Sequence, residues 1–314
     1  MDARFAPFAS DLSTSLALIE DAVRSRREPG VDPSEVVARI QEELRAGRAH
    51  AGLFRRDGRT TGLALWAPSG PLGTAVRLVY LEPTVVSKDA YAELFGAITR
   101  NAGPVAFASP MPGLTFEEEA TVLRSFGFAP FRRSEMRFPS IAPVPSPELP
   151  KGVSVRSLRP TDEAEAARVH AAAYRDRFDR YLFLEDLDPV RDAAQVASLL
   201  FGGRFGEMLF WASALAEANG RAVGATAVIR SGGRALIADV CVDPAYGGRG
   251  VGRALVVATV RALRTRNESA IALAVTEENH RAVRLYEHVG FIRALGPTRE
   301  WYNTRLIPFP PDAD

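Results

Sequence analysis

The two halves of the sequence follow the same order of elements, and this repetition limits the possible folds more than any other feature. Each half contains a hairpin pattern, a third strand-like run, a helical apolar pattern, a Gly-Phe pair and a last strand-like run. The pairs are Gly127-Phe128 and Gly290-Phe291. A glycine after a helix supplies the positive φ of a C-cap, and the next apolar residue can fold back onto the core. We therefore infer an internal duplication with two copies.

A tight hairpin is predicted in each copy. Asp57-Gly58 separates "HAGLFRR" from "TTGLALWA", and Asn219-Gly220 separates "FWASALAEA" from "RAVGATAVIR". These dipeptides accept positive φ at two successive residues, which tight hairpin turns require. A third strand follows each hairpin, at residues 75–81 and 235–242.

The stretch "FPSIAPVPSPELPKG", residues 138–152, lies near the midpoint of the 314 residues. Proline lacks a backbone donor and has a fixed φ, so an extended linker is predicted. We expect a degenerate, structural domain at 1–139, a linker at 140–152 and a catalytic domain at 153–314. The element order predicts the α+β class, with each domain a mixed, mostly antiparallel sheet flanked by helices.

The second copy can be followed element by element. A strand at 152–158 precedes a helix that begins near Asp162, where Asp162 and Glu165 have the spacing of a capping box. A loop-rich helical stretch (174–205) and three antiparallel strands come next. The remaining elements are helices at 250–266 and 279–288, a strand between them at 270–275 and a last strand at 299–306.

Composition excludes several classes of function. The net charge of +1 gives no global attraction to nucleic acid or anionic membranes, and no basic-aromatic pattern favours nucleic-acid binding. No apolar run approaches the roughly 18 residues of a membrane span, and no signal peptide is evident, so we expect a cytoplasmic protein. The single Cys241 excludes an internal disulfide, and the few scattered histidines predict no metal site. A monomer or homodimer is expected.

The stretch "VDPAYGGRGVG", residues 242–252, joins an apolar strand to a helix. A helix N-terminus with unpaired N–H groups attracts anions, and glycines let the chain approach the ligand closely. A P-loop would require Lys-Ser/Thr after the last glycine, where this chain has Arg253-Ala254. A dinucleotide fold would require a different glycine spacing and an acid after the next strand, which Glu268 does not provide.

On these residues the second half resembles the GNAT acetyltransferase superfamily. The loop of that family reads Arg/Gln-x-x-Gly-x-Gly/Ala and follows a strand that ends in Val-x-Pro. Val242, Pro244, Gly250 and Gly252 fit this pattern, whereas Gly247 stands where the family has Arg or Gln. The family's second signature, Asn-x-x-Ala-x-x-x-Tyr followed by Gly-Phe, matches "NHRAVRLYEHVGF", residues 279–291.

The resemblance implies two tandem GNAT-like domains, with acetyl-CoA as co-substrate and the active site in the second copy. The strand around Val242 would pair with the pantetheine arm, and the loop would hold the pyrophosphate. Asn279 would cap its helix and lie near the cofactor. The residues expected to bind acetyl-CoA are Cys241, Val242, Gly247, Gly248, Arg249, Gly250, Val251, Gly252, Arg253 and Asn279. The resemblance makes Tyr286 the acid that protonates the departing thiolate, and a core aromatic is the alternative.

The strand before the loop offers a candidate for the general base. Many family members carry Glu six residues before the Val of Val-x-Pro, and this position is Leu236 here. Asp239 is the acid of the strand "ALIADVCV", and a carboxylate in an apolar strand needs a task or a partner. We predict that Asp239 is a base or an anchor for the substrate amine, and a structural hydrogen bond is the alternative. Cys241 is expected to be a small buried residue rather than a nucleophile.

The first copy lacks the loop. Its counterpart, "EPTVVSKDAYAEL" at residues 82–94, contains no glycine, and Val85 and Val86 would crowd a pyrophosphate. Leu123 stands where the second copy has Tyr286. We therefore expect the first copy to bind no acetyl-CoA in the usual way.

The segment 172–189 matches the family's variable region over the acceptor site. It carries Arg175, Arg177 and Arg180 against Asp176, Asp179, Glu185, Asp186 and Asp188, hence a local charge of 3 − 5 = −2. Such a rim suits a cationic amine, although a solvated surface would look the same. The predicted function is acetyl-CoA-dependent N-acetylation of a small-molecule or peptide amine by direct attack on the thioester. The alternatives are a non-catalytic acyl-CoA-binding or regulatory module and a protein N-terminal acetyltransferase.

Overall fold

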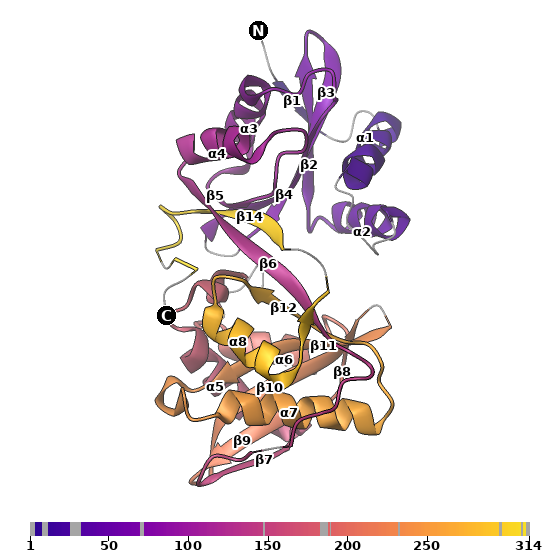
Figure 1. The fold of residues 1–314 in the computed structure, drawn as a ribbon. Coiled ribbons are helices and arrows are strands. Elements are labelled where there is room, and N and C mark those ends of the chain that lie inside the picture. Colours follow the sequence, from indigo (N-terminus) through magenta and orange to yellow (C-terminus); the bar gives the residue numbers. More distant parts are fainter. Residues whose placement is uncertain are drawn as a thin grey trace. The chain divides into compact units, whose positions relative to one another are not determined.

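The computed structural model describes residues 4–7, 12–25, 33–69, 72–146, 148–182, 188, 190–231, 233–294, 297–308 and 310–311. The chain forms two compact units, which Figure 1 shows as ribbons. Unit 1 comprises residues 1–131 and 299–308, and unit 2 comprises residues 132–298 and 309–314. Among the helices that are described, none has the length and apolar character needed to span a membrane.

Unit 1 is a mixed sheet with helices on both faces. Its strands follow the order β1 (Arg4–Pro7), β2 (His50–Arg56), β3 (Arg59–Pro68), β4 (Thr74–Leu81), β5 (Val105–Ala108) and β14 (Thr298–Asn303). The neighbours β4 and β5 are parallel, and the other pairs are antiparallel. Helices α1 (Leu12–Ser25) and α2 (Pro33–Arg45) cover one face, and α3 (Lys88–Ala102) and α4 (Phe116–Ser125) cover the other (Figure 1).

Unit 2 repeats this plan. Its strands follow the order β7 (Val153–Ser157), β9 (Ala214–Ala218), β10 (Arg221–Ser231), β11 (Arg234–Val242), β12 (Ile271–Thr276) and β6 (Phe128–Phe138). Here β11 and β12 are the parallel pair. The two-residue strands β8 (Glu207–Met208) and β13 (Ile292–Arg293) pair with β10 and β6.

The helices of unit 2 also lie on both faces of the sheet. Helices α5 (Glu163–Tyr174) and α6 (Ala193–Phe201) pack on one face. Helices α7 (Val251–Thr265) and α8 (His280–Val289) pack on the other. Short 3₁₀ helices span Pro160–Asp162, Phe178–Leu182 and Pro244–Tyr246. Both units are therefore α+β folds with mostly antiparallel sheets, as predicted.

Each unit is completed by the last strand of the other half of the sequence. Residues 133–138 of β6 pair with β12 in unit 2. In unit 1, Trp301 and Tyr302 of β14 pair with Ala108 and Phe107 of β5, and Trp301 is fully buried. The compact units therefore differ from the predicted limits, because residues 132–139 and 299–308 each belong to the unit of the other half. The structural and catalytic roles of the two domains remain predictions.

The two predicted hairpin turns are present. Asp57 and Asn219 have φ values of 52° and 50°, and Gly58 and Gly220 have φ values of 78° and 72°. A tight hairpin turn requires positive φ at two successive residues, and Asp-Gly and Asn-Gly accept this conformation. Gly290 ends α8 with a φ of 112°, as expected of a C-cap glycine.

The predicted capping box at the start of α5 is wrong. The Asp162 carboxylate accepts hydrogen bonds from Arg156 Nη1 and Nη2 at 2.6 and 2.9 Å and from the Arg159 backbone N–H at 2.7 Å. Glu165 instead accepts from Arg168 at 2.9 Å. A bidentate guanidinium binds a carboxylate more strongly than a backbone N–H does, so the arginine of β7 takes the place of the cap.

The proline-rich stretch has no helix or strand in its described part, residues 139–146 and 148–150. The stretch lies alongside α7. Arg261 Nε donates to the Pro145 carbonyl at 3.2 Å, and Arg253 Nη1 contacts Glu148 Oε2 at 3.1 Å. The stretch is therefore packed along unit 2 rather than solvated on all sides.

Candidate active site

Asp239 and Cys241 face α5 because β11 contains a β-bulge. Against β10, the register passes from Val228 opposite Ile237 to Ala227 opposite Asp239, which leaves Ala238 as an extra residue. Side chains alternate along a strand, so one extra residue moves every later side chain to the opposite face. Ile237 accordingly packs in the core beneath α7, whereas Cys241 packs against α5.

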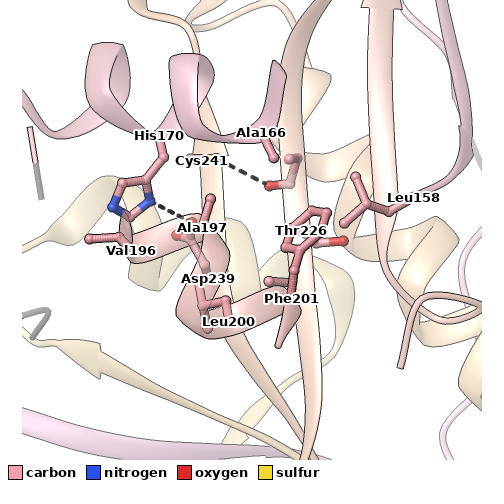
Figure 2. A pocket seen from close by; sticks show the side chains of 12 residues that line it. Leu158, Ala166, His170, Val196, Ala197, Leu200, Phe201, Thr226, Asp239 and Cys241 are labelled. Carbon is pink, nitrogen blue, oxygen red and sulfur yellow. Dashed lines mark hydrogen bonds and ion pairs between the residues drawn. The ribbon is translucent and has the colours of Figure 1, made fainter. Parts of the chain in front are cut away.

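Asp239 is 7% exposed and is bound by two side chains of α5. His170 Nδ1 lies 2.8 Å from Asp239 Oδ2, and a dashed line marks this contact in Figure 2. The Tyr174 hydroxyl donates to Oδ1 at 2.8 Å. A carboxylate can only accept, so the proton of this bond belongs to His170 Nδ1, and Nε2 of the neutral ring is an acceptor. Sequence analysis missed His170 and Tyr174, although their spacing of four residues places them on one face of a helix.

The Asp239 environment changes the proton affinity of its neighbours. Burial raises the pKa of the Tyr174 hydroxyl well above its usual value, and the negative charge of Asp239 adds to this effect. Burial, followed by the charge of Asp239, also raises the pKa of Cys241. Since the thiolate is the nucleophilic form, the Cys241 thiol is unreactive at neutral pH. Cys241 is buried as expected, and its Sγ lies 3.6 Å from the Ala225 carbonyl oxygen.

A cavity of about 20 Å³ lies beside this group and has roughly the volume of one water molecule (Figure 2). His170, Asp239 and Cys241 form its polar end, and most of its other lining side chains are apolar. One donor atom from each of these three residues lies within 4.8 Å of the others, a grouping that could hold a metal ion. His170 Nδ1, both oxygens of Asp239 and the Cys241 thiol already make hydrogen bonds to protein atoms. That the site uses no metal remains a prediction.

Strands β11 and β12 separate at the position of the bulge. In the described part of the chain, the pairing between β11 and β12 is limited to residues 235–237 of β11. Beyond Ile237, the edge of β11 that faces away from β10 therefore has backbone groups that pair with none of the described strands. Such an edge can accept an extended ligand as an added strand, and Val242 lies at its end.

Tyr286 and Asn279 come from α8, next to this opening. Tyr286 is 8% exposed, and burial raises its pKa, with further contributions from the charges of Asp239 and Asp179. Asn279 caps α8 by accepting from the Ala282 N–H at 3.0 Å, and its Nδ2 donates to Asp179 at 2.8 Å. Thr276 Oγ1 donates to the other oxygen of Asp179 at 2.6 Å. Asp179 is therefore held by β12 and α8 rather than free in the solvent.

The glycine loop leaves the N-terminus of α7 open. Gly248 and Gly250 have φ values of 71° and 85°, and Gly250 is the N-cap residue, which provides no side-chain acceptor. A Cβ atom added to Gly252 would lie 3.3 Å from Leu285 Cδ2, so glycine at this position allows close packing of α7 and α8. This arrangement is suited to an anion, because the first N–H groups of a helix are unsatisfied and the helix dipole is positive there.

The corresponding place in unit 1 is closed. Ser87 caps α3 by accepting from the Ala90 N–H at 3.1 Å. Val85 and Val86 pack against the unit 1 core, and Leu123 is fully buried in it. A side-chain cap and packed valines leave no glycine-lined anion site at this place among the residues described here. That the first copy binds no acetyl-CoA remains a prediction.

The predicted acidic rim is only partly described. Arg180 Nη2 contacts Asp188 Oδ2 at 2.8 Å, and Asp188 also accepts from the Val190 and Arg191 N–H groups. Glu185 and Asp186 lie outside the described residues. The role of this rim in binding an amine remains a prediction.

The sequence is similar to known acetyltransferases. The profile described as "Acetyltransferase (GNAT) family" matches residues 171–291. A mycothiol acetyltransferase from Thermomonospora curvata is 31% identical, over 93% of this chain and 96% of that protein. Another from Thermobispora bispora is 35% identical, over 50% of this chain and 52% of that protein. In that second match the chain spans about half the length of its relative.

Solved structures support the same fold. A GCN5-related N-acetyltransferase from Sphaerobacter thermophilus has a TM-score of 0.65 at 19% identity, covering 96% of this chain and 94% of its own. A tandem GNAT protein from the clavulanic acid biosynthesis pathway has a TM-score of 0.53 at 16% identity, covering 96% and 97%. At these identities the likeness concerns the fold alone.

Proposed function

The chain belongs to the GNAT acetyltransferase family, and on this premise we propose that it transfers an acetyl group from acetyl-CoA to an amine in unit 2. The observation that carries the proposal is the uncapped glycine loop of α7, which follows directly on the open edge of β11. The loop can bind the pyrophosphate through Gly248, Gly250 and the amides up to Arg253, and the edge near Val242 can pair with the pantetheine arm.

The reaction is a direct attack on the thioester. The amine nitrogen forms a bond to the acetyl carbonyl carbon, and the carbon–sulfur bond breaks. A backbone N–H near Val242 would stabilise the oxyanion that forms in between. The ammonium proton must leave the nitrogen, and the thiolate of coenzyme A must receive one.

We assign the first of these proton transfers to His170, with Asp239 as its partner. Asp239 holds His170 Nδ1–H and so fixes the tautomer in which Nε2 can accept a proton. This assignment changes the predicted role of Asp239 from a base or an anchor for the substrate amine to the residue that orients the base. Tyr286 would donate a proton to the thiolate, since its raised pKa keeps the phenol protonated at neutral pH.

The first acceptor to test is inferred from the relatives. Relatives that match almost the whole chain are called mycothiol acetyltransferases, so a mycothiol-type acceptor is the first to test. Leu236, in place of the family's strand Glu, weighs against that activity. A non-catalytic acyl-CoA-binding module would explain why Leu236 and Gly247 replace the family's Glu and Arg/Gln. It would assign no function to the buried His170–Asp239 pair. A cytoplasmic location and a monomer or homodimer complete the proposal.

Calorimetric titration of acetyl-CoA into the whole protein tests this function first. We expect micromolar binding, and we expect Gly250→Glu to abolish it, because an anion would then occupy the anion site and Gly250 has a positive φ. Product formation with a panel of amines, beginning with the mycothiol-type acceptor, would follow. Absence of binding to the folded wild-type protein would contradict an acetyltransferase and leave a scaffolding role.

A further inference from the structure

A guanidinium from α8 lies where the first loop position lacks a side chain. Gly247 has φ −60° and ψ 148°, a conformation that any residue adopts, so glycine is not required there by the backbone. The space beside Gly247, in contrast, is already occupied. A Cβ atom at Gly247 would lie 2.9 Å from Arg281 Nη2, 3.4 Å from Arg281 Nη1 and 3.1 Å from the Pro244 carbonyl oxygen.

Unlike Arg249 and Arg253, Arg281 has no competing partner among the residues that the structure describes. Arg249 stacks over the Tyr246 ring at 5.3 Å, and Arg253 forms an ion pair with Glu148 at 3.1 Å. Arg281 is exposed, and it forms no ion pair or side-chain hydrogen bond with the residues that the structure describes. Its charge is therefore available to a ligand of the loop.

We propose that Arg281 binds the pyrophosphate of acetyl-CoA and replaces the charged or amide side chain that the first loop position carries elsewhere in the family. This inference rests on the proposed function. A guanidinium can donate two parallel hydrogen bonds to phosphate oxygens, which complements the single N–H groups of the loop. Because Arg281 belongs to the first turn of α8, the same contact would bring Asn279 and Tyr286 of that helix into register with the bound cofactor.

Calorimetry on the full chain with three proteins tests the assignment: wild type, Arg281→Ala and Arg284→Ala. Arg284 is the matched control, since it is an exposed arginine one turn further along α8. Arg281→Ala should weaken acetyl-CoA binding about tenfold, whereas Arg284→Ala should bind like wild type. Equal affinities for the two variants would overturn the role of Arg281 while leaving the proposed function intact. No binding to wild type would overturn both.

Two further experiments test which phosphate group Arg281 binds and whether Arg281 replaces a side chain at position 247. The loss in Arg281→Ala should be the same with 3′-dephospho-CoA, which keeps the pyrophosphate. A loss that disappears with this ligand would assign Arg281 to the 3′-phosphate and overturn the proposal. Adding Gly247→Arg to Arg281→Ala should recover affinity, since φ and ψ of Gly247 suit any residue and the competing guanidinium is gone, so that only the Pro244 carbonyl oxygen has to shift slightly. Failure to recover, with an unchanged thermal unfolding midpoint, would contradict the replacement.

Discussion

At the scale of single residues, the partners of a side chain decide its role more than its type does. Asp239 looks like a general base in the sequence, because it is a carboxylate in an apolar strand. In the fold, both of its oxygens accept hydrogen bonds from α5, one from His170 and one from Tyr174. A carboxylate with both oxygens engaged is better placed to orient a base than to take a proton from the substrate.

Replacement of Asp239 by Asn should separate these roles. The amide has one acceptor oxygen, so it cannot serve both His170 Nδ1–H and the Tyr174 hydroxyl. We expect kcat to fall about a hundredfold, with little change in the dissociation constant of acetyl-CoA. His170→Gln should cost a similar factor, and the double variant should cost little more than either single one. Unchanged turnover of Asp239→Asn at every pH would remove Asp239 from the mechanism.

Tyr286 offers a second test at the same scale. Burial and two nearby carboxylates raise its pKa, so the phenol stays protonated through neutral and mildly alkaline pH. Tyr286→Phe removes only the hydroxyl and should lower kcat by roughly 10²-fold while acetyl-CoA still binds. Full activity of this variant would instead support the interpretation of Tyr286 as a core aromatic residue.

At the scale of elements, Glu277 connects three parts of unit 2. It follows β12, and it is bound by Arg293 Nε and Nη2 at 2.8 and 2.9 Å and by Ser134 of β6. The hydrogen bonds from Arg293 lower its pKa to about 2. The buried carboxylate therefore stabilises the fold through its charged form.

The pH dependence follows from the direction of this shift. A folded-state pKa below the unfolded value contributes stability above the unfolded pKa of 4.5, and this stability is lost as the pH falls towards 2. Glu277→Gln should lower the free energy of unfolding at pH 7 by about 2 kcal/mol and show a smaller loss between pH 4.5 and 2 than wild type. Urea unfolding at pH 7 and pH 3 measures both effects. Parallel pH profiles for the two proteins would contradict this role.

At the scale of the whole molecule, the exchange of last strands makes each unit depend on both halves of the sequence. Met136 and Phe138 come from the first half and are almost fully buried in the core beneath α7 and α8. Trp301 comes from the second half and is fully buried in the core of unit 1. A division of the chain at the proline-rich stretch would therefore remove core residues from both units.

Truncation tests this dependence. A chain that begins at Lys151 lacks the strand that pairs with β12, so we expect it to unfold at lower temperature than one that begins at Arg132. Thermal unfolding by circular dichroism compares the two, and acetyl-CoA binding reports whether the loop survives. Equal midpoints and equal affinities would show that residues 132–138 are dispensable for unit 2.

The duplication, the fold class, the hairpin turns and the glycine loop could be predicted from the amino-acid sequence, because these features depend on local patterns of apolar, glycine and turn residues. The bulge at Ala238, the pairing of Asp239 with His170 and Tyr174, and the approach of Arg281 to Gly247 were decided by the tertiary structure alone. The exchange of β6 and β14 between the two units was also visible only in the tertiary structure. Each depends on contacts between residues far apart in the chain, and no local pattern records which distant partner will be there.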